Sequence, residues 1–105
     1  MFKSKNISVM NYQDLFTMWF YKTTDNILII DSEYFKDANK ILNEGDRIIV
    51  NQYKDIKKNK GFKATATYVV KSIEEDGSVP LIVLDMNIID NIDIKGKIKE
   101  ECVNC

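Results

Sequence analysis

The chain has 105 residues, of which 45% are hydrophobic, and a formal net charge of −1. This size and apolar content suit one domain with its own core, and the near-neutral charge argues against a dedicated nucleic-acid-binding domain. Histidine is absent, which removes the usual general base at neutral pH and the commonest metal ligand. We therefore expect a single domain that is not an enzyme, with no catalytic residues, no bound metal and no cofactor.

The residue pattern divides the chain into three parts. Residues 1–13 show no sustained period and are predicted to form an N-terminal lead-in, residues 14–85 the core, and residues 86–105 a tail or arm. The longest uncharged apolar stretches, such as Val79 to Leu84, have the length of strands, whereas a membrane-spanning helix needs roughly 20 apolar residues. We therefore expect no membrane partner.

The first part of the core has the pattern of a β-hairpin. The aromatic stretch from Leu15 to Tyr21 is strand-prone, Thr23 to Asn26 has turn chemistry, and Ile27 to Ile30 would be the second strand. Neighbouring residues of a strand face opposite sides, so either the fold covers both faces or one face meets a partner. The candidate self-association residues are Trp19, Phe20 and Tyr21.

An amphipathic helix is predicted from about Ser32 to Leu42. Its apolar residues recur at helical spacing and would form one buried face. Asp31 or Ser32 can cap its first turn, and a glycine stands where a left-handed C-terminal cap belongs. The predicted core and cap residues of this segment are Tyr34, Phe35, Ala38, Ile41, Leu42 and Gly45.

Three further strands are expected after this helix: Asp46 to Tyr53, Phe62 to Ile73 and Val79 to Asp85. Pro80 indicates that the start of the last of them lies at a sheet edge, because proline cannot donate a hydrogen bond to a ladder. The order ββαβββ with short turns predicts a mostly β fold of the β-rich α+β class. We expect a small antiparallel sheet or a partly open barrel with one helix. The tail either adds a last strand or docks on a neighbour.

Three groups of residues have functional interpretations, and each also has a structural one. The loop lysines Lys54, Lys57, Lys58 and Lys60 either contact phosphate weakly or belong to a hairpin loop exposed to solvent. Cys102 and Cys105 are either reduced, flexible thiols or half of a zinc site shared between chains of an oligomer. The acids at Glu74 to Asp76 and at Asp85, Asp90 and Asp93 lack the spacing of a calcium loop and are interpreted as solvated turns.

Three stretches of the chain resemble a group of small structural proteins of tailed phages and prophages. Tyr21 to Asp25, Tyr34 to Ala38 and Leu42 to Ile48 match the pattern Y-x-T-x-D … Y-F-x-D-A … L-x-x-G-D-x-I. Ala64 to Ser72 resembles the strand that follows in that group, so the resemblance covers about residues 16–85. It implies a virion-associated role without catalysis, such as head decoration or a fibre-like component. The lysine loop and the cysteine pair depart from the group's pattern.

The leading hypothesis is therefore a phage or prophage virion structural protein, a capsid decoration or fibre-like component, that self-associates and docks on other virion proteins. A homo-oligomer is expected, with three chains favoured because fibre-like parts resembling this group are often trimeric. Such a protein would be made in the host cytoplasm and would end in the virion. The alternative is a small cytoplasmic β-barrel-like binding module with a protein or RNA partner.

Overall fold

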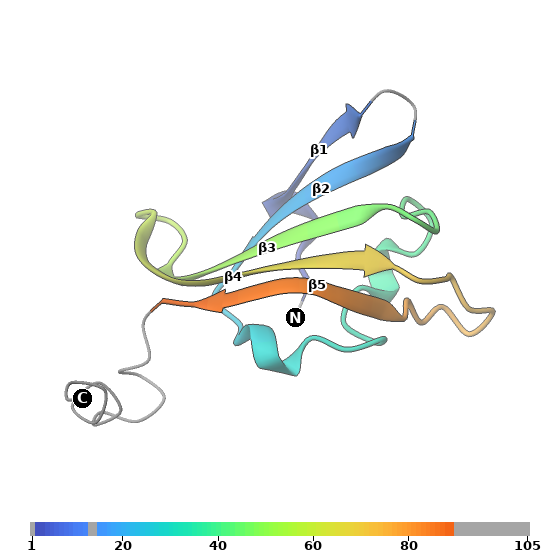
Figure 1. Ribbon diagram of the computed structural model, residues 1–105. Coiled ribbons are helices and arrows are strands. Elements are labelled where there is room, and N and C mark those ends of the chain that lie inside the picture. Colours follow the sequence, from blue (N-terminus) through green and yellow to red (C-terminus); the bar gives the residue numbers. More distant parts are fainter. Residues whose placement is uncertain (1, 13–14, 90–105) are drawn as a thin grey trace.

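Five β-strands form a single sheet in the computed structural model, which describes residues 2–12 and 15–89 (Figure 1). Their order across the sheet follows the chain, so β1 and β5 are the two edges and the sheet is not closed into a barrel. The described residues otherwise form short 3₁₀ turns and irregular segments, without an α-helix. The predicted mostly β class is confirmed. The strands are β1 (Ile7–Tyr12), β2 (Phe16–Thr23), β3 (Arg47–Asp55), β4 (Lys60–Val70) and β5 (Leu81–Ile88).

The sheet is mixed, whereas the prediction was antiparallel throughout. The pairs β1–β2, β3–β4 and β4–β5 are antiparallel, but β2 and β3 run parallel. Parallel neighbours need a crossover of about a dozen residues or more, and residues 24–46 supply one. Figure 1 shows much of this crossover, in turquoise, on one side of the sheet.

The predicted α-helix from about Ser32 to Leu42 is wrong. The segment forms successive turns, including the 3₁₀ turn η3 (Lys36–Ala38), and most of its backbone hydrogen bonds join residues three apart. The Asp31 side chain accepts the Glu33 amide, the hydrogen bond expected of a cap, but a continuous α-helix does not follow it. The Ser32 carbonyl, which in an α-helix would accept the amide of Lys36, instead accepts the Val79 amide, and the Lys36 amide donates to the Glu33 carbonyl.

The apolar residues of this segment nevertheless enter the core, with one exception. Ile41 is 46% exposed, because the turns do not keep the period of an α-helix and the predicted stripe is broken there. Gly45 has a φ of +91°, the left-handed conformation that was predicted for it, although it leads into β3 instead of ending a helix. The residues that are buried as predicted are Tyr34, Phe35, Ala38 and Leu42.

Two other predictions fail near the beginning of the chain. The lead-in predicted for residues 1–13 contains β1, which is the hairpin partner of β2. The strand predicted for Ile27 to Ile30 is instead the 3₁₀ turn η2 (Ile27–Ile29), with the Asn26 side chain accepting the Leu28 amide. Because β1 and β3 occupy both edges of β2, no edge of β2 remains for a strand at this position.

The later strands agree more closely with the sequence. Strands β3 and β4 lie where they were predicted, and β5 is an edge strand that begins directly after Pro80. It continues to Ile88, beyond the core boundary predicted at residue 85. The alternation predicted for β4 is also confirmed, since its buried residues are Ala64, Ala66, Tyr68 and Val70.

The core lies between one face of the sheet and the crossover. An aromatic cluster occupies its centre, with ring centroids 5.5 Å apart for Tyr21 and Phe35 and 5.0 Å apart for Tyr34 and Phe35. Phe2 stacks on Tyr21 at 5.2 Å, so the segment before β1 also packs on this cluster. These rings come from both the sheet and the crossover, so their packing determines which face of the sheet the crossover covers.

Candidate functional site

The sheet has a second face on which no described residue is fully buried. Alternation along β2 turns Trp19 and Tyr21 toward the core and Phe20 to the other side. The strand register continues this second face across the sheet, because Phe20 lies opposite Ile49. We term this side the open face. Its apolar residues are Phe16, Met18, Phe20, Ile49, Tyr53, Phe62, Val69 and Ile82.

The three residues predicted for self-association are divided between the two faces. Tyr21 is 0% exposed and belongs to the core. Trp19 is partly buried against the core, and Phe20 is partly buried on the open face. Of this predicted set, Phe20 is therefore the residue that faces away from the core.

A buried aspartate joins the beginning of β3 to β2 and to the crossover. Asp46 is 3% exposed. Its carboxylate accepts hydrogen bonds from the Thr17 amide at 3.1 Å, from Trp19 Nε1 at 2.9 Å and from the Asn43 amide at 2.9 Å. Its backbone carbonyl accepts the Val70 amide. The Gly-Asp of the matched sequence pattern thus has a structural role in this fold.

The β3–β4 hairpin brings aromatic rings and a lysine together at one end of the open face. Tyr53 and Phe62 lie opposite each other, and their ring centroids are 5.5 Å apart. Lys22 reaches across from β2, with Nζ 5.8 Å from the centroid of the Tyr53 ring. The same Nζ donates a hydrogen bond to Oδ1 of Asn59 at 3.2 Å, which links β2 to the hairpin turn.

The lysines of the predicted loop lie in and beside a tight turn of this hairpin. Strand β3 continues to Asp55 and β4 begins at Lys60, so the turn itself consists of residues 56–59. The Asp55 carboxylate accepts the Lys58 amide at 3.2 Å and closes the turn. In Figure 1 this hairpin end, in yellow-green, curls beyond the strands. The predicted phosphate-contacting residues Lys54, Lys57, Lys58 and Lys60 are all exposed.

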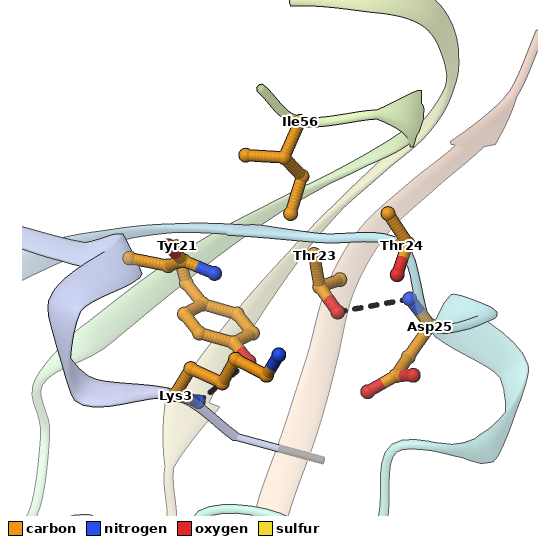
Figure 2. Close-up of a pocket in the computed structure, with 7 residues that line it drawn as sticks. Lys3, Tyr21, Thr23, Thr24, Asp25 and Ile56 are labelled. Atoms are coloured by element: carbon orange, nitrogen blue, oxygen red, sulfur yellow. Dashed lines mark hydrogen bonds between the residues drawn. The ribbon is translucent and has the colours of Figure 1, made fainter.

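A polar pocket of about 180 Å³ lies near the same hairpin end, where Ile56 forms part of its wall (Figure 2). Its polar groups bind one another. The Lys3 amide donates to the Tyr21 hydroxyl at 3.0 Å, and the Asp25 amide donates to the Thr23 hydroxyl at 2.9 Å. Behind them, the Tyr34 hydroxyl donates to Oδ2 of Asp25 at 2.7 Å. The Tyr34 hydroxyl also shares hydrogen bonds with the Tyr21 and Thr23 hydroxyls of β2, at 3.3 and 3.2 Å. We interpret this arrangement as a structural network that holds the crossover onto β2.

Burial and hydrogen bonding shift two pKa values in this network in opposite directions. Burial raises the pKa of Tyr34 above its ordinary value; the hydrogen bond with Thr23 lowers this pKa by less than burial raises it, and the hydrogen bonds with Tyr21 and Asp25 raise it further. Partial burial acts to raise the pKa of Asp25, but its hydrogen bonds, including the one from Tyr34, lower it below the ordinary value. Near neutral pH the phenol therefore stays a donor and the carboxylate an acceptor.

Strand β5 presents an apolar edge. Among the described residues it pairs with β4 and with no other strand. The successive side chains of Ile82, Val83 and Leu84 are 48%, 52% and 55% exposed. The register shifts between Thr67 and Tyr68, which leaves Leu84 as an extra residue, a β-bulge, in the edge strand. The bulge explains why consecutive side chains are exposed here in place of alternate ones.

The remaining groups singled out in the sequence divide between the described and undescribed parts of the chain. The two cysteines, Asp90 and Asp93 lie outside the described residues. Asp76 lies in the turn before β5, where hydrogen bonds from the Ser78 hydroxyl and amide hold its pKa below the ordinary value.

Within residues 2–12 and 15–89, no three His, Cys, Asp or Glu side chains gather to hold a metal ion. No helix in that part of the chain is long and apolar enough to cross a membrane.

The aromatic pair at the hairpin end was missed by the sequence analysis, although the sequence contains a signal for it. Tyr53 and Phe62 are equidistant from the hairpin turn, as are Asp55 and Lys60, and such positions lie opposite each other in a regular two-stranded ladder. Lys22 gives no such signal, because its place beside Tyr53 depends on the parallel pairing of β2 with β3.

A scan against protein-family models gave no match, and searches of curated proteins and of solved structures gave no similar protein. The function is therefore argued from the residue pattern and from the geometry of the sheet.

Proposed function

We propose that this chain is a non-enzymatic structural protein of a phage or prophage particle, which acts by self-association and by docking on the particle. The observation that carries self-association is the apolar edge of β5. A strand edge offers backbone N–H and C=O groups to which another strand can pair. Such pairing would also bury the exposed side chains of Val83 and Leu84. The virion role is supported by the resemblance of Tyr34 to Ala38 and of Leu42 to Ile48 to the phage proteins.

The proposed partner of β5 is a second copy of the chain. A formal net charge of −1 produces little repulsion between copies. The edge adjoins a row of the open face in which Val69 lies opposite Ile82, so an approaching copy covers apolar surface beyond the strand pairing itself. Each β5 has one free edge, so two copies that pair through it close a two-fold dimer, in place of the trimer expected from the resemblance. Other virion proteins would then bind the assembled form.

Sedimentation equilibrium of the full chain at micromolar concentration tests this proposal. We expect a mass near twice the 12.2 kDa of one chain. The double variant Val83→Lys, Leu84→Lys should sediment as a monomer, because lysine on an edge strand opposes further strand pairing. The matched control is Val9→Lys, Met10→Lys on the other edge strand, β1, where the native side chains are 56% and 52% exposed. The control should assemble like the native chain.

Two results would contradict the proposal. One is a native chain that sediments as a monomer of 12.2 kDa. The other is assembly that survives the double change on β5. Circular dichroism of each variant establishes that the strand content is retained, so that loss of assembly is not loss of folding.

A further inference from the structure

Two aromatic rings form an accessible surface at the hairpin end of the open face. The rings of Tyr53 and Phe62 are tilted by 51° with centroids 5.5 Å apart, and Phe62 is 40% exposed. Neither ring belongs to the core cluster or to the residues packed against it, so core packing does not explain their presence. Exposed aromatic rings on a sheet can stack with the bases of a nucleic acid, because every base has an aromatic face.

Lysines lie beside these rings and in the adjoining turn. Lys22 lies beside the Tyr53 ring and is held there by its hydrogen bond to Asn59. Four exposed lysines follow in the hairpin, and Asp55 is the one acid between residues 54 and 62. The near-neutral charge of the whole chain therefore conceals a local excess of lysine. Charge of this sign is complementary to a phosphate backbone.

The turn that carries the lysines is tightly closed. Its acid, Asp55, is engaged with the Lys58 amide. Gly61 has a φ of +74°, and a Cβ added to it would lie 2.5 Å from Cβ of Lys54. The two strands thus approach each other more closely than a side chain at this position would allow. The lysines are carried by a defined turn next to the aromatic pair, and not by a long irregular loop.

We propose that this end of the open face, termed the hairpin corner (Lys22, Tyr53, Phe62 and the hairpin lysines), binds single-stranded nucleic acid. Bases stack on Tyr53 and Phe62, while phosphates contact the lysines. Lysine is a point charge without the planar fork that reads base edges in pairs, so binding has little sequence preference. The bases of a duplex already stack on one another and cannot reach the rings, so single strands are preferred. This site is separate from the β5 edge.

Fluorescence anisotropy with a labelled oligouridylate of about 12 nucleotides tests the proposal on the full chain. We expect saturable binding at low salt, with a log–log salt slope of about −2 to −3 for three or four phosphate contacts. Phe62→Ala should weaken binding about tenfold at every salt concentration, because it removes a stacking ring. Lys57→Glu combined with Lys58→Glu should weaken binding and flatten the salt slope. The matched control, Lys40→Glu with Lys71→Glu, makes the same change of charge at exposed positions outside the corner.

A duplex of equal length is measured in parallel, and circular dichroism establishes that each variant is folded. Should Phe62→Ala be unfolded, Phe62→Leu removes the ring while keeping most of the apolar volume. The proposal is overturned if the single strand shows no saturable binding. It is also overturned if loss of the Phe62 ring leaves the affinity unchanged, or if the control lowers affinity as much as the hairpin variant. Equal affinity for the duplex would mean that charge alone attracts the strand, which excludes stacking.

Discussion

Asp46 joins β2 to the crossover through one buried carboxylate, which accepts the Thr17 amide, the Trp19 indole and the Asn43 amide. Asparagine would turn an N–H donor toward at least one of these donors. A buried donor left without an acceptor costs about 1–3 kcal/mol. Asp46→Asn should therefore lower the free energy of unfolding by about that amount in urea denaturation.

The matched control for this prediction is Asp37→Asn, which removes the same charge from an exposed position in the crossover. Its free energy of unfolding should stay within about 0.5 kcal/mol of the native value. Equal denaturation midpoints for the Asp46 and Asp37 variants would show that the three hydrogen bonds add nothing to stability.

Ionisation of Tyr34 lowers the stability of the fold at alkaline pH. Burial first, and then its hydrogen bonds with Tyr21 and Asp25, raise its pKa in the folded chain above the ordinary value of 10.0. Above pH 10.0 the unfolded chain therefore releases the phenol proton while the folded chain keeps it, so the free energy of unfolding falls as pH rises. Below that pH this contribution is complete. Tyr34→Phe should be less stable than the native chain at about pH 8 but should lose less further stability toward about pH 11.

The measurement is a series of urea denaturations across that range for both chains. If stability falls equally with pH for the native chain and for Tyr34→Phe, the loss of stability at alkaline pH comes from other groups. A second contribution of the same sign comes from Tyr68, whose pKa is also raised by burial.

At the residue scale, burial was the property best predicted from the sequence. Tyr34, Phe35, Ala38 and Leu42 are buried as expected, because a large apolar side chain gains free energy on leaving water in any backbone conformation. The hydrogen bond between Trp19 and Asp46 was not predicted. It joins residues far apart in sequence, and no local pattern specifies such a pair.

At the scale of elements, two glycines with positive φ allow the cost of a left-handed backbone to be compared with the cost of a steric clash. Gly45 has a φ of +91° and nothing within 4 Å of an added Cβ, whereas at Gly61 the added Cβ would collide with Lys54. Gly45→Ala should thus cost about 1 kcal/mol for the left-handed backbone alone. Gly61→Ala should cost about 1–3 kcal/mol more, because the hairpin strands must move apart.

Thermal or urea denaturation of the two alanine variants tests this order of stability. Equal destabilisation by the two changes would mean that the hairpin end opens without cost. In that case the close approach at Gly61 would not constrain the turn that carries the lysines.

Elements that depend on local pattern were predicted, and elements that depend on distant pairing were not. Strands β3 and β4 follow from alternation and a short turn. The parallel pairing of β2 with β3 depends on the path of residues 24–46, for which the apolar spacing suggested an α-helix. Spacing reports which side chains are buried. It does not specify the backbone conformation that buries them, and here the segment forms turns.

For the whole molecule, the parts of the candidate sites that the sequence predicts are the ones that depend on residues close together in the chain. The exposed lysines and the edge character of the last strand were expected from Pro80 and the loop residues. The pairing of Tyr53 with Phe62 and the bulge at Leu84 required the register. The sheet therefore separates two surfaces, an apolar edge on β5 and a basic aromatic corner on the β3–β4 hairpin, which variants can test independently.

Amide hydrogen exchange followed as a function of protein concentration should show this separation directly. In a dilute sample, amides of the edge strands β1 and β5 should exchange faster than those of β3, which has a hydrogen-bonded neighbour on each side. As concentration rises and the chain assembles, exchange in β5 should slow, because amides that point away from β4 gain partners in the second copy. Exchange in β1 should stay unchanged. Slowing confined to β1, or to neither edge, would place the contact between copies elsewhere than the Ile82 to Leu84 edge.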